Sequence, residues 1–265
     1  MKILLLSILL LLAGLVASLF GQGGGVLYTP IQILLGVPFQ TASTTSLFLI
    51  MVMAFSSTIV FHKAQTVDWQ MAATMEIPTM TGAFVGGFIS DYLSENILIL
   101  TLVGLLIIGS FAMNRKASQQ RKTFSPAKEK VWIWKRNMNG VSYQINILLL
   151  IPVTLLVGFL TSIVGIGGGP IKVPMMVLLF GVPMDIAVGS SAFMVGLTAT
   201  AGMIGHTAMG HWDWRISLIL AVPVFIGGQI GSHFSTRLKK EKLQKWFSIF
   251  LLVIAVIIFI QKIGV

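Results

Sequence analysis

Two glycine clusters carry the first indication of chemistry in this sequence. They are Gly21-Gln22-Gly23-Gly24-Gly25 and Gly165-Ile166-Gly167-Gly168-Gly169, and a short apolar stretch follows each. Adjacent glycines hold a helix poorly, at a cost of about 1 kcal/mol each relative to alanine, so we expect the backbone to break there. Pro170 suits the first position of a restarted helix, because no N–H is needed at that position. Free N–H groups and positive dipole ends at such breaks attract an anion.

Polar side chains near the two breaks extend the hypothesis of an anion site. Lys172 lies in the first turn of the restarted helix, and several hydroxyls lie on the neighbouring apolar spans. Unpaired donors in a medium of low dielectric are costly until a carboxylate, sulfonate or sulfite oxygen accepts them. Two alternatives stay open: the glycines only allow close helix packing, and Lys172 extends to the outer lipid headgroups. The predicted substrate-binding residues are Gly23, Gly24, Gly25, Thr44, Thr45, Ser46, Gly167, Gly168, Gly169, Lys172, Ser190 and Ser191.

Glu76 is a second ionisable residue inside a predicted span. It lies about two turns, or roughly 10 Å, into its segment, where a charge is expensive and usually functional. We predict that it carries a coupling proton; the alternative is that it only bonds a neighbouring helix. We expect no catalytic residue, no metal and no cofactor, since the chain has no cysteine, no His-Glu-x-x-His motif and no paired intramembrane aspartates.

The composition indicates a membrane protein. Hydrophobic residues make up 55% of the 265 residues and charged residues 10%, against roughly 25% charged in a soluble domain. The net charge of +10 is concentrated in two segments, with eight basic residues between Arg115 and Arg136 and five between Arg237 and Lys245. Such clusters are typical of cytoplasmic loops beside membrane spans. We therefore expect the lipid bilayer and a small anion as partners, and no nucleic acid; a homo-oligomer is left open.

The second half of the chain repeats the first. Gly36-Val37-Pro38 recurs as Gly181-Val182-Pro183, and Asp68-Trp69 recurs as Asp213-Trp214, at a constant spacing of 145 residues. In the first half we expect membrane segments at residues 3–20, 26–35, 40–61, 69–89 and 96–113. The predicted domains are a first transmembrane repeat (1–113), a partly ordered basic cytoplasmic linker (114–144) and a second transmembrane repeat (145–265).

The charges of equivalent loops predict the orientation of the repeats. The loop before the last segment is acidic in the first repeat, with Asp91 and Glu95, and basic in the second, from Arg237 to Lys245. Equivalent loops should therefore lie on opposite sides of the membrane. The predicted fold is an all-α polytopic membrane protein with two inverted repeats of about five segments, in which glycine-broken short helices meet near the midplane. This architecture is typical of secondary transporters that work by alternating access.

The motifs also resemble a known family. The pattern is Gly-x-Gly-Gly-Gly before an apolar run with proline, then Gly-Val-Pro, then Ala187-Val188-Gly189-Ser190-Ser191, Trp212-Asp213-Trp214-Arg215, Gly227-Gly228-Gln229-Ile230-Gly231-Ser232 and Arg237-Leu238. It resembles the TauE/SafE family of sulfite exporters over nearly the whole chain, with departures at Gln22 and from Gln40 to Ser46. The resemblance implies transport of sulfite, sulfonates or related organic anions across the cytoplasmic membrane, coupled to a proton or to the membrane potential. The alternatives are an anion channel and a membrane-embedded enzyme; we expect no enzyme.

Overall fold

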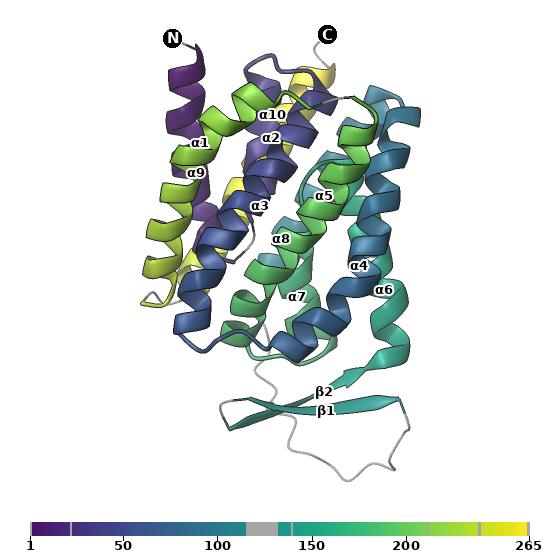
Figure 1. The fold of residues 1–265 in the computed structure, drawn as a ribbon, viewed down its shortest axis with the longest axis vertical. Coiled ribbons are helices and arrows are strands. Elements are labelled where there is room, and N and C mark those ends of the chain that lie inside the picture. Colours follow the sequence, from purple (N-terminus) through teal and green to yellow (C-terminus); the bar gives the residue numbers. More distant parts are fainter. Residues whose placement is uncertain are drawn as a thin grey trace.

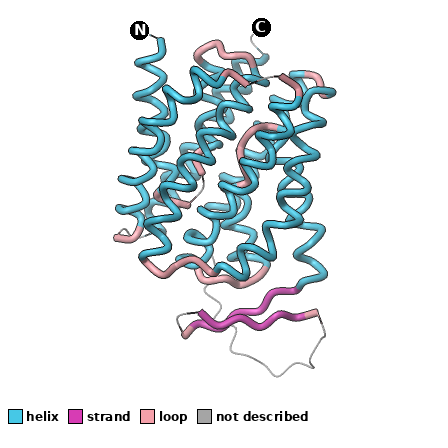
Figure 2. Tube along the Cα trace, in the orientation of Figure 1, coloured by secondary structure: helices cyan, strands magenta, loops and turns pink. Residues whose placement is uncertain are grey.

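The computed structural model describes residues 2–21, 23–114, 132–138, 140–210, 212–237 and 240–263. This part of the chain is mostly helical, as predicted (Figures 1 and 2). The helices of the first half are α1 (Lys2–Ser18), α2 (Gly25–Leu34), α3 (Phe39–Lys63), α4 (Trp69–Ile89), the short 3₁₀ turn η1 (Ser90–Tyr92) and α5 (Glu95–Asn114). Those of the second half are α6 (Ile147–Ile163), α7 (Gly169–Leu179), α8 (Met184–Ala208), α9 (Trp214–Ser235) and α10 (Lys240–Ile263).

Corresponding helices of the two halves begin in the same way. Pro38 precedes α3 with φ −55° and ψ 144°, and Pro183 precedes α8 with φ −55° and ψ 142°. The side chains of Asp68 and Asp213 cap α4 and α9 by accepting backbone N–H groups of the first turn. The register found in the sequence therefore corresponds to a repeated order of helices with repeated caps.

The fourth helix of each half packs against the other half. α4 lies mainly against α6 and α8, whereas α9 lies mainly against α1 and α3. Figure 1 shows this exchange, with α1 and α9 together at the left and α4 and α6 together at the right. The last helices of the two halves, α5 and α10, pack against each other. Because each half supplies a helix to the other, burying apolar surface requires both halves.

Glycines allow the exchanged helices to approach closely. A Cβ added to Gly82 of α4 would lie 2.1 Å from the backbone oxygen of Leu155 in α6. The corresponding position at the other crossing is Gly227 of α9, where a Cβ would lie 2.5 Å from the backbone oxygen of Leu11 in α1. Close packing of helices therefore depends on these mid-helix glycines, and the glycine clusters have close contacts as well, since a Cβ added to Gly25 would lie 2.4 Å from the backbone oxygen of Ile166.

Apolar side chains face outward around the bundle. α3, α8 and α9 are each long and apolar enough to cross a membrane, and shorter apolar helices accompany them in the described part of the chain. Large hydrophobic side chains such as Phe55, Ile77, Phe111 and Ile260 are more than half exposed on the outer surface. A surface of this kind suits lipid rather than water.

The linker contains a β-hairpin that we did not predict from the sequence. β1 (Ile133–Met138) and β2 (Val141–Asn146) are antiparallel. Gly140 lies at the turn with φ +76°, a conformation that favours glycine. Figure 2 shows the hairpin at one end of the bundle, next to the start of α6. Residues 115–131, which hold most of the predicted basic linker, lie outside the described residues, as does Lys239 of the second basic segment.

Candidate functional site

Both glycine clusters interrupt the helices, as predicted. Gly24 and Gly168 precede α2 and α7 in left-handed conformations, with φ values of +74° and +85°. Pro170 lies in the first turn of α7, so the predicted restart of the helix is confirmed. α2 has 10 residues and α7 has 11, and helices of that length cover only about half of a bilayer.

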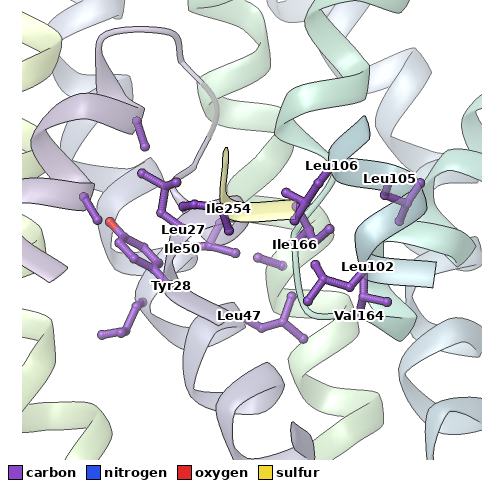
Figure 3. Packing of buried hydrophobic residues seen from close by; sticks show 14 of the residues in the cluster. Leu27, Tyr28, Leu47, Ile50, Leu102, Leu105, Leu106, Val164, Ile166 and Ile254 are labelled. Atoms are coloured by element: carbon purple, nitrogen blue, oxygen red, sulfur yellow. The ribbon is translucent and has the colours of Figure 1, made fainter. Parts of the chain in front are cut away.

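The two breaks meet at an apolar contact. A Cβ added to Gly23 would lie 2.2 Å from Val195 and 2.9 Å from Ile50, and one added to Gly167 would meet the same two side chains at 3.5 Å and 3.2 Å. Figure 3 shows Ile50 beside Ile166, with other buried hydrophobic side chains around them. Glycine at these positions therefore permits both breaks to approach the side chains of Ile50 and Val195.

Lys172 is buried at the start of α7 rather than extended to the headgroups. Its side chain has 0% relative exposure. The ammonium Nζ donates a hydrogen bond to Oε2 of Glu76 at 2.8 Å. It also donates to the backbone oxygen of Met194 at 3.0 Å and to the hydroxyl of Thr198. All three donor positions of the ammonium are thus occupied.

Glu76 completes a closed polar cluster with Lys172 and Thr198. Its side chain has 1% relative exposure, and its Oε1 accepts a hydrogen bond from the Thr198 hydroxyl. The three residues come from α4, α7 and α8, so both halves of the chain contribute. An isolated charge at such a depth costs several kcal/mol, whereas the pair together carries no net charge. We call these residues, together with the Met194 carbonyl, the ion-pair site.

The predicted hydroxyls do not contact Lys172 in this conformation. The Thr44 hydroxyl bonds the backbone oxygen of Gln40, and Ser46 accepts a bond from Gln32 at 2.8 Å. Thr45 is buried, and Ser191 is buried without a hydrogen-bond partner for its hydroxyl in the described part of the chain. Ser190 instead accepts a bond from the backbone N–H of Asp68 at 2.9 Å. Their role in binding substrate stays a prediction.

Comparison with known proteins assigns the chain to a family. Residues 6–258 match the family described as sulfite exporter TauE/SafE. The chain belongs to the TauE/SafE family. It is similar to a probable membrane transporter protein, YunE, of Bacillus subtilis, at 29% identity over 96% of both chains. It is also similar to a probable membrane transporter protein of Methanocaldococcus jannaschii, at 24% identity over 91% of this chain and 89% of the relative.

These relatives support a general function. The family and the relatives' names indicate a membrane transporter rather than an enzyme. A probable membrane transporter protein of Xylella fastidiosa is 28% identical over 94% of this chain and 91% of its own length. No solved structure matches the chain. Within the described residues, no group of three histidine, aspartate or glutamate side chains is placed to hold a metal ion.

A second polar cluster of this TauE/SafE protein lies at the hairpin. The carboxylate of Asp68 accepts bonds from Arg136 of β1, at 2.6 Å from Nη2 and 3.1 Å from Nε, and from the hydroxyl of Tyr143 of β2. Although burial raises the pKa of Asp68, the hydrogen bonds from Arg136 and Tyr143 bring it below the ordinary value of 3.8. Asp68 is therefore ionised near neutral pH. We call Asp68, Arg136 and Tyr143 the hairpin latch.

We missed two features of these sites in the sequence. Glu76 and Lys172 were predicted as separate functional residues, but opposite charges deep in a membrane protein usually pair. The hairpin also has a sequence signal, because Asn139-Gly140 is the most common type of two-residue hairpin turn. Thr198 had no comparable signal, since a lone threonine in an apolar helix usually bonds its own backbone.

Proposed function

We propose that this TauE/SafE protein is a secondary transporter of small anions in the cytoplasmic membrane, which its chain crosses several times. Sulfite, sulfonates and related organic anions are the candidate substrates. The observation that carries the proposal is the buried ion pair between Lys172, in the first turn of the broken helix α7, and Glu76 of α4. A purely structural helix contact would not need two charges in lipid, because apolar side chains of similar volume hold such contacts as well or better.

The ion-pair site supports binding of an anion in exchange for a carboxylate. In the observed conformation, Glu76 occupies Lys172 and no charge is left over. Protonation of Glu76 at Oε2 would neutralise its carboxylate and free one donor position of the ammonium. An incoming oxyanion can then accept that hydrogen bond, and the positive end of the α7 dipole adds to the attraction. One proton and one negative charge enter together, so the site stays neutral throughout.

Alternating access between two inverted repeats is the second part of the proposal. Its support is the direction of equivalent helices: in Figure 1, α1 begins at the top, whereas α6 begins at the bottom beside the hairpin. Asp91 and Glu95 follow α4, which starts at the hairpin end, and so lie at the opposite end. The hairpin end carries Lys135 and Arg136 of the basic linker, and we place this end in the cytoplasm.

Cysteine labelling tests this orientation, because the chain has no native cysteine. Ser94→Cys, Gln144→Cys and Lys245→Cys change exposed residues of the acidic loop, the hairpin and the second basic segment. In sealed right-side-out vesicles, an impermeant maleimide should label only the Ser94→Cys variant. Labelling of Ser94→Cys and Lys245→Cys from the same face would refute the inverted arrangement.

Uptake into proteoliposomes tests the transport proposal. Purified protein is reconstituted, and radiolabelled sulfite or a short alkyl sulfonate is offered under an inward proton gradient. We expect saturable uptake that collapses when the gradient is dissipated and that is lost in Lys172→Met. Non-saturating flux that follows only the voltage would indicate a channel. Absence of uptake for every anion in a panel of sulfite, sulfonates and carboxylates would refute the proposal.

A further inference from the structure

We propose that the β1–β2 hairpin is a gate on the cytoplasmic side of the ion-pair site, and that Asp68 is the residue that positions this gate. The hairpin latch would hold the gate shut by fixing the hairpin across the ends of α4 and α8. That anions pass through this gate rests on the proposed function, whereas the opening and closing of the hairpin does not.

One helix seam connects the latch with the ion-pair site. Asp68, just before α4, and Glu76, within α4, are eight residues apart. Ser190 and Thr198 of α8 are also eight residues apart. Asp68 contacts Ser190 at one end of the seam, and Glu76 contacts Thr198 at the other. Eight helical residues span about 12 Å. Separation of α4 from α8 at the hairpin would therefore open a route about two turns long to the buried charges.

The latch joins the hairpin to both helices of this seam. The Asp68 carboxylate binds Arg136 and Tyr143 of the hairpin, and it also caps α4 by accepting the backbone N–H of Met71 at 3.1 Å. The backbone N–H of the same aspartate donates to Ser190 of α8. A bidentate arginine–carboxylate pair fixes direction as well as distance. One residue thus sets the position of the hairpin, α4 and α8 together.

Apolar side chains of the hairpin complete the closure. Tyr143 is 4% exposed and Ile145 is 0% exposed, and both belong to a core cluster with residues of α4 and α8. Ala72, halfway between Asp68 and Glu76, is buried in the same cluster. The hairpin therefore keeps water from this end of the seam, in addition to making polar contacts.

The corresponding end of the other half has no such cover among the described residues. Asp213 occupies the place of Asp68 in the repeat and caps α9 by accepting the N–H groups of Arg215 and Ile216. Its side chain is partly exposed, and the described residues show no arginine or tyrosine on its carboxylate. Both aspartates cap a helix, but only Asp68 also binds side chains of the linker among the described residues.

The latch should hold across the physiological pH range. The folded pKa of Asp68 lies below its ordinary value, so its contribution to stability is present above a pH of about 4 and is lost as the pH falls through the folded pKa. The titratable groups that face this carboxylate are the charged guanidinium of Arg136 and the neutral phenol of Tyr143, and Ser190 faces the backbone of Asp68. Asp68 would thus not take up a proton near neutral pH, so the gate is not the site of proton coupling.

Reactivity of a buried cysteine tests the gate. Ala72→Cys places a thiol in α4, in the buried cluster that includes Tyr143 and Ile145 of the hairpin. Ala17→Cys is the matched control, because Ala17 of α1 is 1% exposed and lies outside the seam. Each is combined with Asp68→Asn, which keeps an oxygen for the helix cap but loses the charge that binds Arg136. Modification by a hydrophilic methanethiosulfonate is followed in lipid nanodiscs. We expect Asp68→Asn to speed the reaction at Ala72→Cys at least tenfold and to leave Ala17→Cys within twofold.

Two further variants make the result decisive. Asp213→Asn removes the matched charge at the other end and should leave the reactivity of Ala72→Cys unchanged. Arg136→Gln breaks the latch from the hairpin side and should reproduce the effect of Asp68→Asn, even if one of the two variants folds poorly. Unchanged reactivity in both latch variants, or equal gains at Ala72→Cys and Ala17→Cys, would overturn the gate. Faster labelling without any anion transport would leave the gate standing and refute the proposed function instead.

Discussion

Lys172 and Tyr28 occupy the same position in the two broken helices, but their hydrogen-bond partners differ in charge. Each follows its left-handed glycine, Gly168 or Gly24, by four residues, and each is fully buried. Lys172 forms an ion pair with Glu76, whereas the Tyr28 hydroxyl contacts only the sulfur of Met53 at 3.1 Å among the described hydrogen bonds. Both halves contain a broken helix, but only the second places a charged side chain at this position.

The partners of these two residues also correspond. Met53 of α3 and Thr198 of α8 are 145 residues apart, and so are Glu76 of α4 and Ala221 of α9. The described hydrogen-bond partner of the Tyr28 hydroxyl is a neutral methionine, whereas those of the Lys172 ammonium include a carboxylate and a hydroxyl. The repeated architecture thus places two residues equivalently, and only Lys172 brings the charge that the proposed anion site requires. We therefore expect one anion site per chain.

The largest effect should follow from removing the charge of Lys172. Lys172→Met keeps most of the stem but leaves Glu76 unpaired, so anion transport should fall at least about 30-fold, which corresponds to about 2 kcal/mol. The free energy of unfolding should fall by about 3–5 kcal/mol, because a buried partner is stranded. Uptake assays and denaturant unfolding measure the two losses.

A double variant separates function from stability at this site. Lys172→Met combined with Glu76→Gln removes both charges, so it should recover most of the lost stability while transport stays absent. Recovery of transport in the double variant would show that the ion pair only holds the helices together. Loss of stability equal to the sum of the single variants would contradict the pairing itself.

A smaller effect should follow from filling the space beside Lys172. In Gly168→Ala, the new Cβ would lie 3.1 Å from Cε of Lys172 at φ +85°. Gly181→Ala is the matched control, since Gly181 has φ +64° and no atom within 4 Å of the added Cβ. Both should lose about 1–2 kcal/mol of stability from the left-handed conformation. Only Gly168→Ala should also weaken apparent anion affinity, by about tenfold, or about 1.4 kcal/mol.

The smallest effect should follow from the equivalent change in the neutral half. Tyr28→Phe removes one hydroxyl, and the free energy of unfolding should fall by about 0.5–1.5 kcal/mol. Apparent affinity and maximal rate of anion uptake should both stay within twofold of the native protein. A loss of transport as large as that of Lys172→Met would mean that both halves bind substrate, and the proposed asymmetry would be wrong.

Much of the scaffold could be predicted from the sequence because it depends on local rules. Adjacent glycines break helices, Pro170 starts one, and Asp68 and Asp213 cap the helices that follow them. Residues that break or cap a helix in the first half recur 145 positions later in the second half. This constant spacing shows which helices of the two halves are equivalent. None of these rules concerns which helices touch, so the exchange of α4 and α9 between the halves was not predicted.

The same limit applies to the candidate site. Glu76 and Lys172 were each recognised as charges in unusual places, but 96 positions separate them in the chain, and their pairing depends on α4 packing against the other half. The hydroxyls were grouped by their closeness to the breaks in sequence, although Ser190 lies at the hairpin end of its helix. The hairpin was missed for a different reason: the charge of the linker was weighed, and its Asn139-Gly140 turn signal was not.

Proton movement accompanying the anion is the most direct test of the exchange at Lys172. Proteoliposomes loaded with a pH-sensitive dye receive an inward sulfite gradient without an initial pH difference. Native protein should carry protons inward with the anion and acidify the interior. Glu76→Gln should still exchange external for internal sulfite, because Lys172 remains, but should move no protons. Sulfite transport by the native protein without acidification, or acidification that persists in Glu76→Gln, would contradict the account.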